Sequence, residues 1–114
     1  MSPGNPERLH GTLELLVLKL LDPGAMNGYA IGVRIQELTD GAVIVEEGSL
    51  YPALYRMQRR GWLKTEWGKS ENNRRAKFYR LTADGRRGLR AKIKSWQKLA
   101  DAMATAIVAE IEKA

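Results

Sequence analysis

Residues 46–61 read EEGSLYPALYRMQRRG, and this stretch decides how the rest of the chain is interpreted. Leu50, Leu54 and Met57 lie four and then three positions apart, a spacing that places them on one face of a helix. Gly61 comes directly afterwards, and glycine commonly follows the end of a helix. The stretch therefore predicts a helix that buries one face and is closed by Gly61.

The segment before this stretch predicts another helix and a tight connection. Asn27 is a favourable helix-capping residue, and the apolar periodicity that follows it ends near Thr39. Asp40 and Gly41 then form a turn signal, and residues 42–45 are too short to be more than a minimal strand. The side chains expected to be buried in this helix are Tyr29, Ile31, Ile35 and Leu38. Helix, tight connection and helix together are typical of a helix-turn-helix.

The chain upstream begins with a Pro-, Gly- and Asn-rich segment, residues 1–8, which we expect to be a disordered arm. Residues 9–21 read LHGTLELLVLKLL and have the length and periodicity of a helix. Leu15 and Leu18 lie opposite the main apolar stripe of this helix. Because a small domain rarely buries two faces of one helix, we expect a second chain to cover these two leucines.

After the central helix the period of the sequence changes. Residues 62–67 and 76–81 alternate in the manner of two strands, and Asn72 and Asn73 between them favour a hairpin turn. The segment therefore predicts a β-hairpin next to the helix-turn-helix.

The final segment predicts one long helix over residues 83–112, capped by Thr82. Its apolar residues follow one another in steps of three and four, which describes a continuous stripe. At 1.5 Å per residue such a helix is about 45 Å long, so it would project from a domain of this size and expose its stripe. A second copy of the chain is the expected cover.

Together these elements predict a mainly α fold with a small β-hairpin (α+β). A winged helix-turn-helix spans residues 9–81, and a C-terminal dimerisation helix spans residues 82–114. The expected homodimer interface comprises Leu15, Leu18, Leu89, Ile93, Trp96, Leu99, Met103, Ile107 and Ile111.

The composition of the 114-residue chain argues against several kinds of chemistry. Cysteine is absent and His10 is the only histidine, so we expect no metal site and no cysteine nucleophile. Without a glycine-rich phosphate loop we also expect no cofactor and no enzymatic activity. No segment has the apolar length of a membrane span, and residues 1–6 lack the layout of a signal peptide, so we expect a cytoplasmic protein.

The net charge of +6 is unevenly distributed. Between Arg56 and Lys94 there are fourteen Lys and Arg residues against three acidic ones, a local charge of +11. A basic block with interleaved Tyr and Trp residues is the electrostatic footprint of a protein that binds nucleic acid. From charge alone, the solvated surface of an ordinary basic protein is an equally good interpretation.

The exposed side of the central helix gives the first candidate binding surface. Its residues are Ser49, Tyr51, Pro52, Tyr55, Arg56 and Arg59. Hydroxyls and arginines near the start of a helix suit the major groove of double-stranded DNA, where arginine pairs with guanine and tyrosine reaches phosphate. The alternative is an ordinary solvent-facing surface, but two exposed tyrosines beside a proline are unusual on such a face.

The hairpin gives the second candidate surface. Its residues are Lys64, Lys69, Arg74, Arg75, Lys77 and Tyr79. A basic hairpin beside such a helix can bind phosphates or enter the neighbouring minor groove. Charged hairpin ends also occur simply for solubility.

Trp96 lies in the middle of the stripe on the last helix. A tryptophan in this position usually packs in an interface. A sharper hypothesis is that Trp96 of two subunits, together with Leu15, lines a pocket for a planar apolar effector. The two roles are compatible.

Four segments resemble the PadR family of bacterial transcriptional repressors. They are GTLELLVLKLL (11–21), NGYAIGVRIQ (27–36), GSLYPALYRMQRRGWL (48–63) and RRAKFYRLTADGRRGL (74–89). The resemblance implies a dimeric repressor that binds an inverted repeat upstream of its own or a neighbouring gene and is released by a ligand or another signal.

The resemblance also implies roles for individual residues. The family's recognition-helix motif corresponds to Leu50, Tyr51 and Pro52, and its wing residues correspond to Arg74, Arg75, Lys77 and Tyr79. Short members of the family bind aromatic compounds at the dimer interface through a tryptophan that corresponds to Trp96. A winged-helix module that binds only an acidic protein is the competing hypothesis, and salt-sensitive binding to duplex DNA would separate the two.

Overall fold

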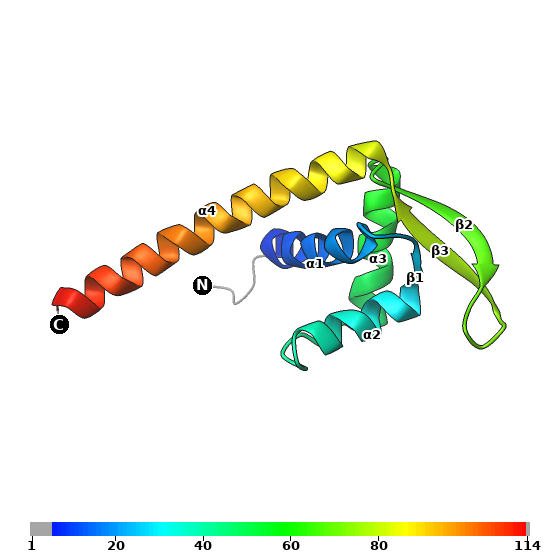
Figure 1. The fold of residues 1–114 in the computed structure, drawn as a ribbon, viewed down its shortest axis with the longest axis horizontal. Coiled ribbons are helices and arrows are strands. Elements are labelled where there is room, and N and C mark those ends of the chain that lie inside the picture. Colours follow the sequence, from blue (N-terminus) through cyan, green and yellow to red (C-terminus); the bar gives the residue numbers. More distant parts are fainter. Residues whose placement is uncertain (1–5, 114) are drawn as a thin grey trace.

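The computed structural model describes the backbone of residues 6–113 and the side chains of residues 11–112. In this part of the chain Figure 1 shows helices with a small antiparallel sheet at one end, the predicted α+β fold. In chain order the elements are α1 (Pro6–Leu21), β1 (Met26–Asn27), α2 (Gly28–Leu38), α3 (Glu47–Arg59), β2 (Leu63–Lys69), β3 (Arg75–Leu81) and α4 (Ala83–Lys113).

Helix α1 begins earlier than the sequence predicts. It starts at Pro6 instead of Leu9, so residues 6–8 of the expected arm are helical. The rest of that arm, residues 1–5, lies outside the described residues, as does the side chain of His10.

Two predicted caps are present where α2 and α4 begin. Asn27 Oδ1 accepts a hydrogen bond from the Ala30 N–H at 2.8 Å. Thr82 Oγ1 accepts one from the Gly85 N–H at 3.0 Å. Each cap satisfies a backbone donor that the first helical turn leaves without a partner and contributes about 1 kcal/mol.

The sheet has a third strand that the sequence analysis placed wrongly. Strand β1 pairs with β3, Met26 opposite Tyr79 and Asn27 opposite Phe78, and the strand order is β1-β3-β2. Residues 42–45 form no strand. Because Asn27 caps α2 it has an extended backbone, with φ −80° and ψ 162°, and this conformation also lets it pair with β3.

Helix α1 lies at the centre of the chain's own core. It packs against α2, α3, β3 and α4, and Figure 1 shows it between α2 and α4. Leu18 is fully buried, and Leu89 on α4 is 4% exposed, so the expectation that both face a second chain is wrong. Leu15 is half-buried against the same core. The two apolar faces of α1 are explained mostly by elements of this chain.

Helix α2 buries a narrower stripe than predicted. Gly28, Ile31 and Ile35 are its buried residues, whereas Tyr29 and Leu38, which we expected inside, are 77% and 56% exposed. The outer side of α2 therefore remains open to solvent.

Helix α4 projects from the domain, as its length predicts (Figure 1). The molecule measures 58 × 29 × 27 Å, and every side chain from residue 101 to residue 112 is exposed. The base of α4 is anchored on Trp62, whose carbonyl oxygen accepts a hydrogen bond from the Thr82 N–H at 3.0 Å. A Cβ added at Gly88 would lie 2.7 Å from the Trp62 ring, so the first turns of α4 fit Trp62 closely.

Candidate nucleic-acid interface

Helix α3 presents a polar face to solvent because its apolar residues are buried on the other side. The exposed members of the predicted set are Ser49, Tyr51, Pro52, Tyr55 and Arg59. Arg59 Nη1 donates a hydrogen bond to Tyr55 Oη at 3.3 Å, and the Arg59 guanidinium lies 5.9 Å from the centre of the Tyr55 ring. This face combines hydroxyls with a guanidinium, the groups that contact phosphates and base edges.

Arg56 does not belong to that face. It is half-buried, and its Nε lies 3.7 Å from Oε2 of the buried Glu14 on α1. Among the described residues Arg56 Nη2 is a buried donor without a hydrogen-bond partner. The ion pair with α1 turns the Arg56 side chain inward, so our expectation of a groove contact from it is wrong for this conformation.

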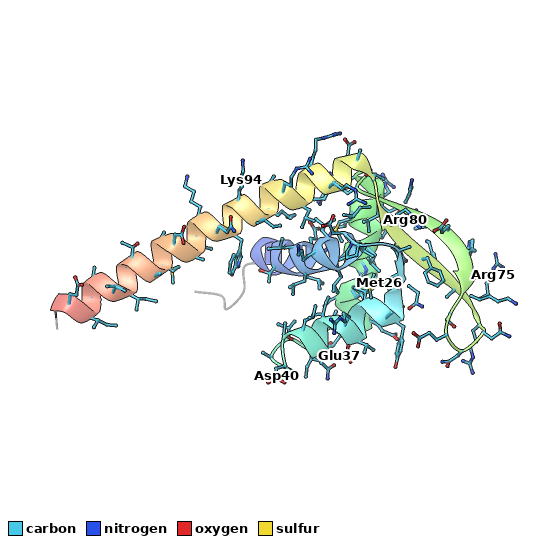
Figure 2. All side chains as sticks on the ribbon, viewed as in Figure 1. Met26, Glu37, Asp40, Arg75, Arg80 and Lys94 are labelled. Atoms are coloured by element: carbon cyan, nitrogen blue, oxygen red, sulfur yellow. The ribbon has the colours of Figure 1, made fainter. Side chains whose placement is uncertain are left out.

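Near the tip of the β2–β3 hairpin, cationic and aromatic side chains share one face. Lys69 is directly opposite Arg75, and Trp67 is directly opposite Lys77. Opposite residues in an antiparallel pair point to the same side, as do residues two apart in one strand. Figure 2 shows the Arg75 side chain directed outward from this end of the hairpin.

Trp67 is a surface residue that the sequence analysis missed. It is 61% exposed, and the Arg75 guanidinium lies 4.3 Å from the centre of its ring. Its position two residues along from the half-buried Thr65 and four from the buried Leu63 suggests a core residue. The hairpin extends past the core at this point, so the same sheet face becomes solvent-exposed.

The hairpin turn lies where the asparagines predict it. The Asn73 N–H donates to the Ser70 carbonyl oxygen at 2.9 Å, and the Ser70 N–H donates to the Arg74 carbonyl oxygen at 2.8 Å. Asn73 has φ +58°, a left-handed conformation that asparagine tolerates better than most residues. The turn leaves the predicted contact residue Arg74 exposed.

Two predicted wing residues lie away from this tip. Lys64 is opposite Arg80 at the base of the hairpin, on the other sheet face. Tyr79 is 6% exposed, and the Lys77 ammonium lies 5.7 Å from its ring centre. Burial raises the pKa of the Tyr79 hydroxyl above its ordinary value, and the nearby Tyr51 adds to the shift. Tyr79 therefore packs largely beneath the surface, and only a small part of its side chain is exposed.

A groove of about 430 Å³ lies between the start of α2, Tyr51 of α3 and the hairpin. It is lined by Asn27, Gly28, Tyr29, Tyr51, Ser70, Asn72, Arg74, Arg75, Ala76, Lys77 and Tyr79. The Tyr51 ring reaches the groove by packing directly over Gly28, where an added Cβ would lie 2.7 Å from Tyr51 Cε1. The start of α2 was not predicted as part of this site, because its role depends on a contact between residues far apart in sequence.

The second candidate surface is the apolar stripe of α4. Trp96, Leu99, Met103, Ile107 and Ile111 are all more than half exposed, and Val108 is a further exposed apolar residue. Ile93 is half-buried against the core. Monomeric proteins rarely expose so continuous a row of apolar side chains.

The described part of the chain offers neither a cluster of side chains for a metal ion nor a helix for a membrane span. Within it, no cluster of three or more His, Asp or Glu side chains could hold a metal ion. No helix there combines the length and apolar character needed to span a bilayer.

The helix pair α2 and α3, the hairpin and the short third strand define the class of winged helix-turn-helix proteins. Residues 17–91 match the model of the Transcriptional regulator PadR-like family. The chain belongs to this family.

Solved structures of regulators are similar over most of the chain. A transcriptional regulator from Clostridium thermocellum has 26% sequence identity and a TM-score of 0.77, covering 87% of this chain and 96% of its own. A PadR-like transcriptional regulator from Bacillus cereus has 25% identity and a TM-score of 0.76, covering 89% and 96%. A PadR family transcriptional regulator from Eggerthella lenta has 32% identity and a TM-score of 0.70, covering 89% and 87%.

Proposed function

We propose that this chain is a cytoplasmic repressor that binds an inverted-repeat operator in double-stranded DNA as a homodimer. The carrying observation is the groove in which Tyr51 of α3 meets Arg74, Arg75 and Lys77 of the hairpin. A helix that carries hydroxyls and a guanidinium can enter the major groove, while cations on the adjoining hairpin bind phosphates or the minor groove.

The stripe of α4 supports the dimeric part of this proposal. A second copy would cover Trp96, Met103 and Ile107 and would bring a second recognition helix to the complex. Dimers of this class read two half-sites about one helical turn, ~34 Å, apart. An inverted repeat is then the matching DNA symmetry.

Arg59→Ala tests DNA binding through α3. The variant is expected to lose about 1–3 kcal/mol of affinity for the protein's own promoter fragment if Arg59 contacts a base, or to lower the salt slope by about 1 if it contacts phosphate. Fluorescence anisotropy over a salt series measures both quantities.

The matched control is Arg90→Ala, which removes an exposed arginine from α4. Equal losses in both variants would indicate a general charge effect and would contradict the role of α3. If the unmodified protein failed to bind the fragment even at low salt, the proposal would be wrong and an acidic protein partner would be favoured.

We also propose that a planar apolar effector stacks on Trp96 in the dimer and weakens DNA binding. Trp96 is 56% exposed, which leaves its ring accessible to either a ligand or a second subunit. A planar aromatic dye is expected to quench tryptophan fluorescence in the unmodified protein and to lose this effect in Trp96→Ala. The control Trp67→Phe should keep the quenching, and undiminished quenching in Trp96→Ala would place the dye elsewhere.

A further inference from the structure

Glu14 of α1 is a buried carboxylate that pairs with cations from two other helices. It is 4% exposed. Arg60 Nη1 and Lys92 Nζ lie 3.0 and 3.5 Å from Glu14 Oε1. Arg56 Nε lies 3.7 Å from Glu14 Oε2. One side chain of α1 thus brings together Arg56 of α3, Arg60 just after α3 and Lys92 of α4.

This convergence depends on Glu14 because the three cations repel one another. In the described part of the chain, Arg56, Arg60 and Lys92 form ion pairs with no other acidic side chain. All three lie within 3.7 Å of one carboxylate, and Arg56 and Lys92 are half-buried, so repulsion between their like charges is incompletely screened. Without the carboxylate, the Lys92 end of the cluster is expected to move away from the two arginines.

Trp62 completes the junction between the end of α3 and the base of α4. The Arg60 guanidinium lies 4.5 Å from the centre of the Trp62 ring system, and the Lys92 ammonium lies 5.8 Å from it. The same ring fits against Gly88 of α4. Cation–π contacts and close packing therefore reinforce the link that Glu14 makes.

The junction lies between the two surfaces on which the proposed function depends. Arg56 is next to Tyr55 on the helix that carries the polar face, and Lys92 precedes the exposed apolar stripe of α4 by one turn. Any change in the angle between α3 and α4 must alter these contacts. A buried ion pair is well suited to this task because its geometry is specific and breaking it is costly.

We infer that Glu14 is a positioning residue that holds α3 at a set distance and angle from α4 and thereby determines which half-site spacing the dimer accepts. This inference rests on the proposed function. It assigns to Glu14, Arg56, Arg60 and Lys92 a role in operator selection that requires no contact with DNA.

The test measures how strongly the protein discriminates between half-site spacings, and not its overall affinity for DNA. Duplexes that the unmodified protein selects from a random library are remade with the spacer one or two base pairs shorter or longer. Anisotropy then gives the affinity ratio between the best and the altered spacers. We expect Glu14→Gln and Lys92→Met each to reduce this ratio about fivefold, the lower end of typical coupling between sites.

Lys94→Met is the matched control. It removes the same charge from α4, but Lys94 is exposed, forms no ion pair in the described part of the chain, and points away from α1 in Figure 2. Sedimentation equilibrium must show that each variant compared is as dimeric as the unmodified protein. If Glu14→Gln does not fold, Lys92→Met decides alone, since it removes only the contacts that Lys92 of α4 makes with Glu14 and Trp62.

Loss of discrimination in Lys92→Met but not in Lys94→Met supports the inference. Unchanged discrimination in folded Glu14→Gln and Lys92→Met, or equal losses in all three variants, overturns it while leaving the proposed function intact. A failed selection, in which the unmodified protein enriches no inverted repeat, overturns the proposed function and this inference with it.

Discussion

Met103→Glu is expected to leave the chain monomeric and to lower its affinity for the inverted repeat at least about a hundredfold. Met103 lies in the middle of the exposed stripe, between Leu99 and Ile107. A glutamate there would have to be buried without a partner when a second copy covers the stripe, and an unpaired buried charge is strongly unfavourable. A monomer keeps its contacts to one half-site but loses the gain from binding both at once.

Thr105→Glu is the control for this prediction. It adds the same charge two residues further on, nearly opposite the stripe on the helix, at a position that is also exposed. Sedimentation equilibrium measures the mass of each variant, and anisotropy measures its affinity. A dimeric Met103→Glu variant, or a monomeric unmodified protein, would contradict the proposed dimer through α4.

The helix-turn-helix was predictable because its signals are local in sequence. Leu50, Leu54 and Met57 are buried together, as their spacing predicts. Gly61 follows α3 with φ +83°, a conformation that glycine adopts without strain. Each of these features depends only on residues within a few positions of one another.

Helix α1 shows where periodicity is insufficient. The pattern of leucines shows that both sides of α1 are apolar but not which chain covers them. Leu18 is covered by the chain's own core, so the argument for a dimer now depends on α4 and no longer on α1.

The elements of the candidate surface could be predicted more readily than its individual members. Charge and hydroxyl content indicated α3 and the hairpin. The inward turn of Arg56, by contrast, results from its ion pair with Glu14 on α1. Such contacts are distant in sequence: Arg60, which binds the same carboxylate, is 46 positions from Glu14. Tyr79, which we expected at the surface, is buried, whereas Trp67 is exposed, because the core ends between them along the sheet.

Gly85→Ala is expected to destabilise the fold by about 3 kcal/mol, the upper end of the usual cost of overpacking. A Cβ on Gly85 would overlap the Trp62 carbonyl oxygen, so the first turn of α4 would have to move away from Trp62. That movement strains the Thr82 N–H to Trp62 hydrogen bond and the cap that Thr82 provides for Gly85. For a chain of this size the loss corresponds to a Tm lower by about 12 °C in thermal unfolding followed by circular dichroism.

Gly32→Ala distinguishes this clash from the general effect of replacing a helical glycine. A Cβ at Gly32 on α2 would lie 3.6 Å from Leu50 Cδ2, an ordinary van der Waals contact. Since alanine reduces the backbone entropy of the unfolded chain, this control should be more stable by roughly 0.5–1 kcal/mol. Both variants must be compared at one protein concentration, because dimerisation would make Tm depend on it. A Gly85→Ala variant as stable as Gly32→Ala would show that the base of α4 does not require its close approach to Trp62.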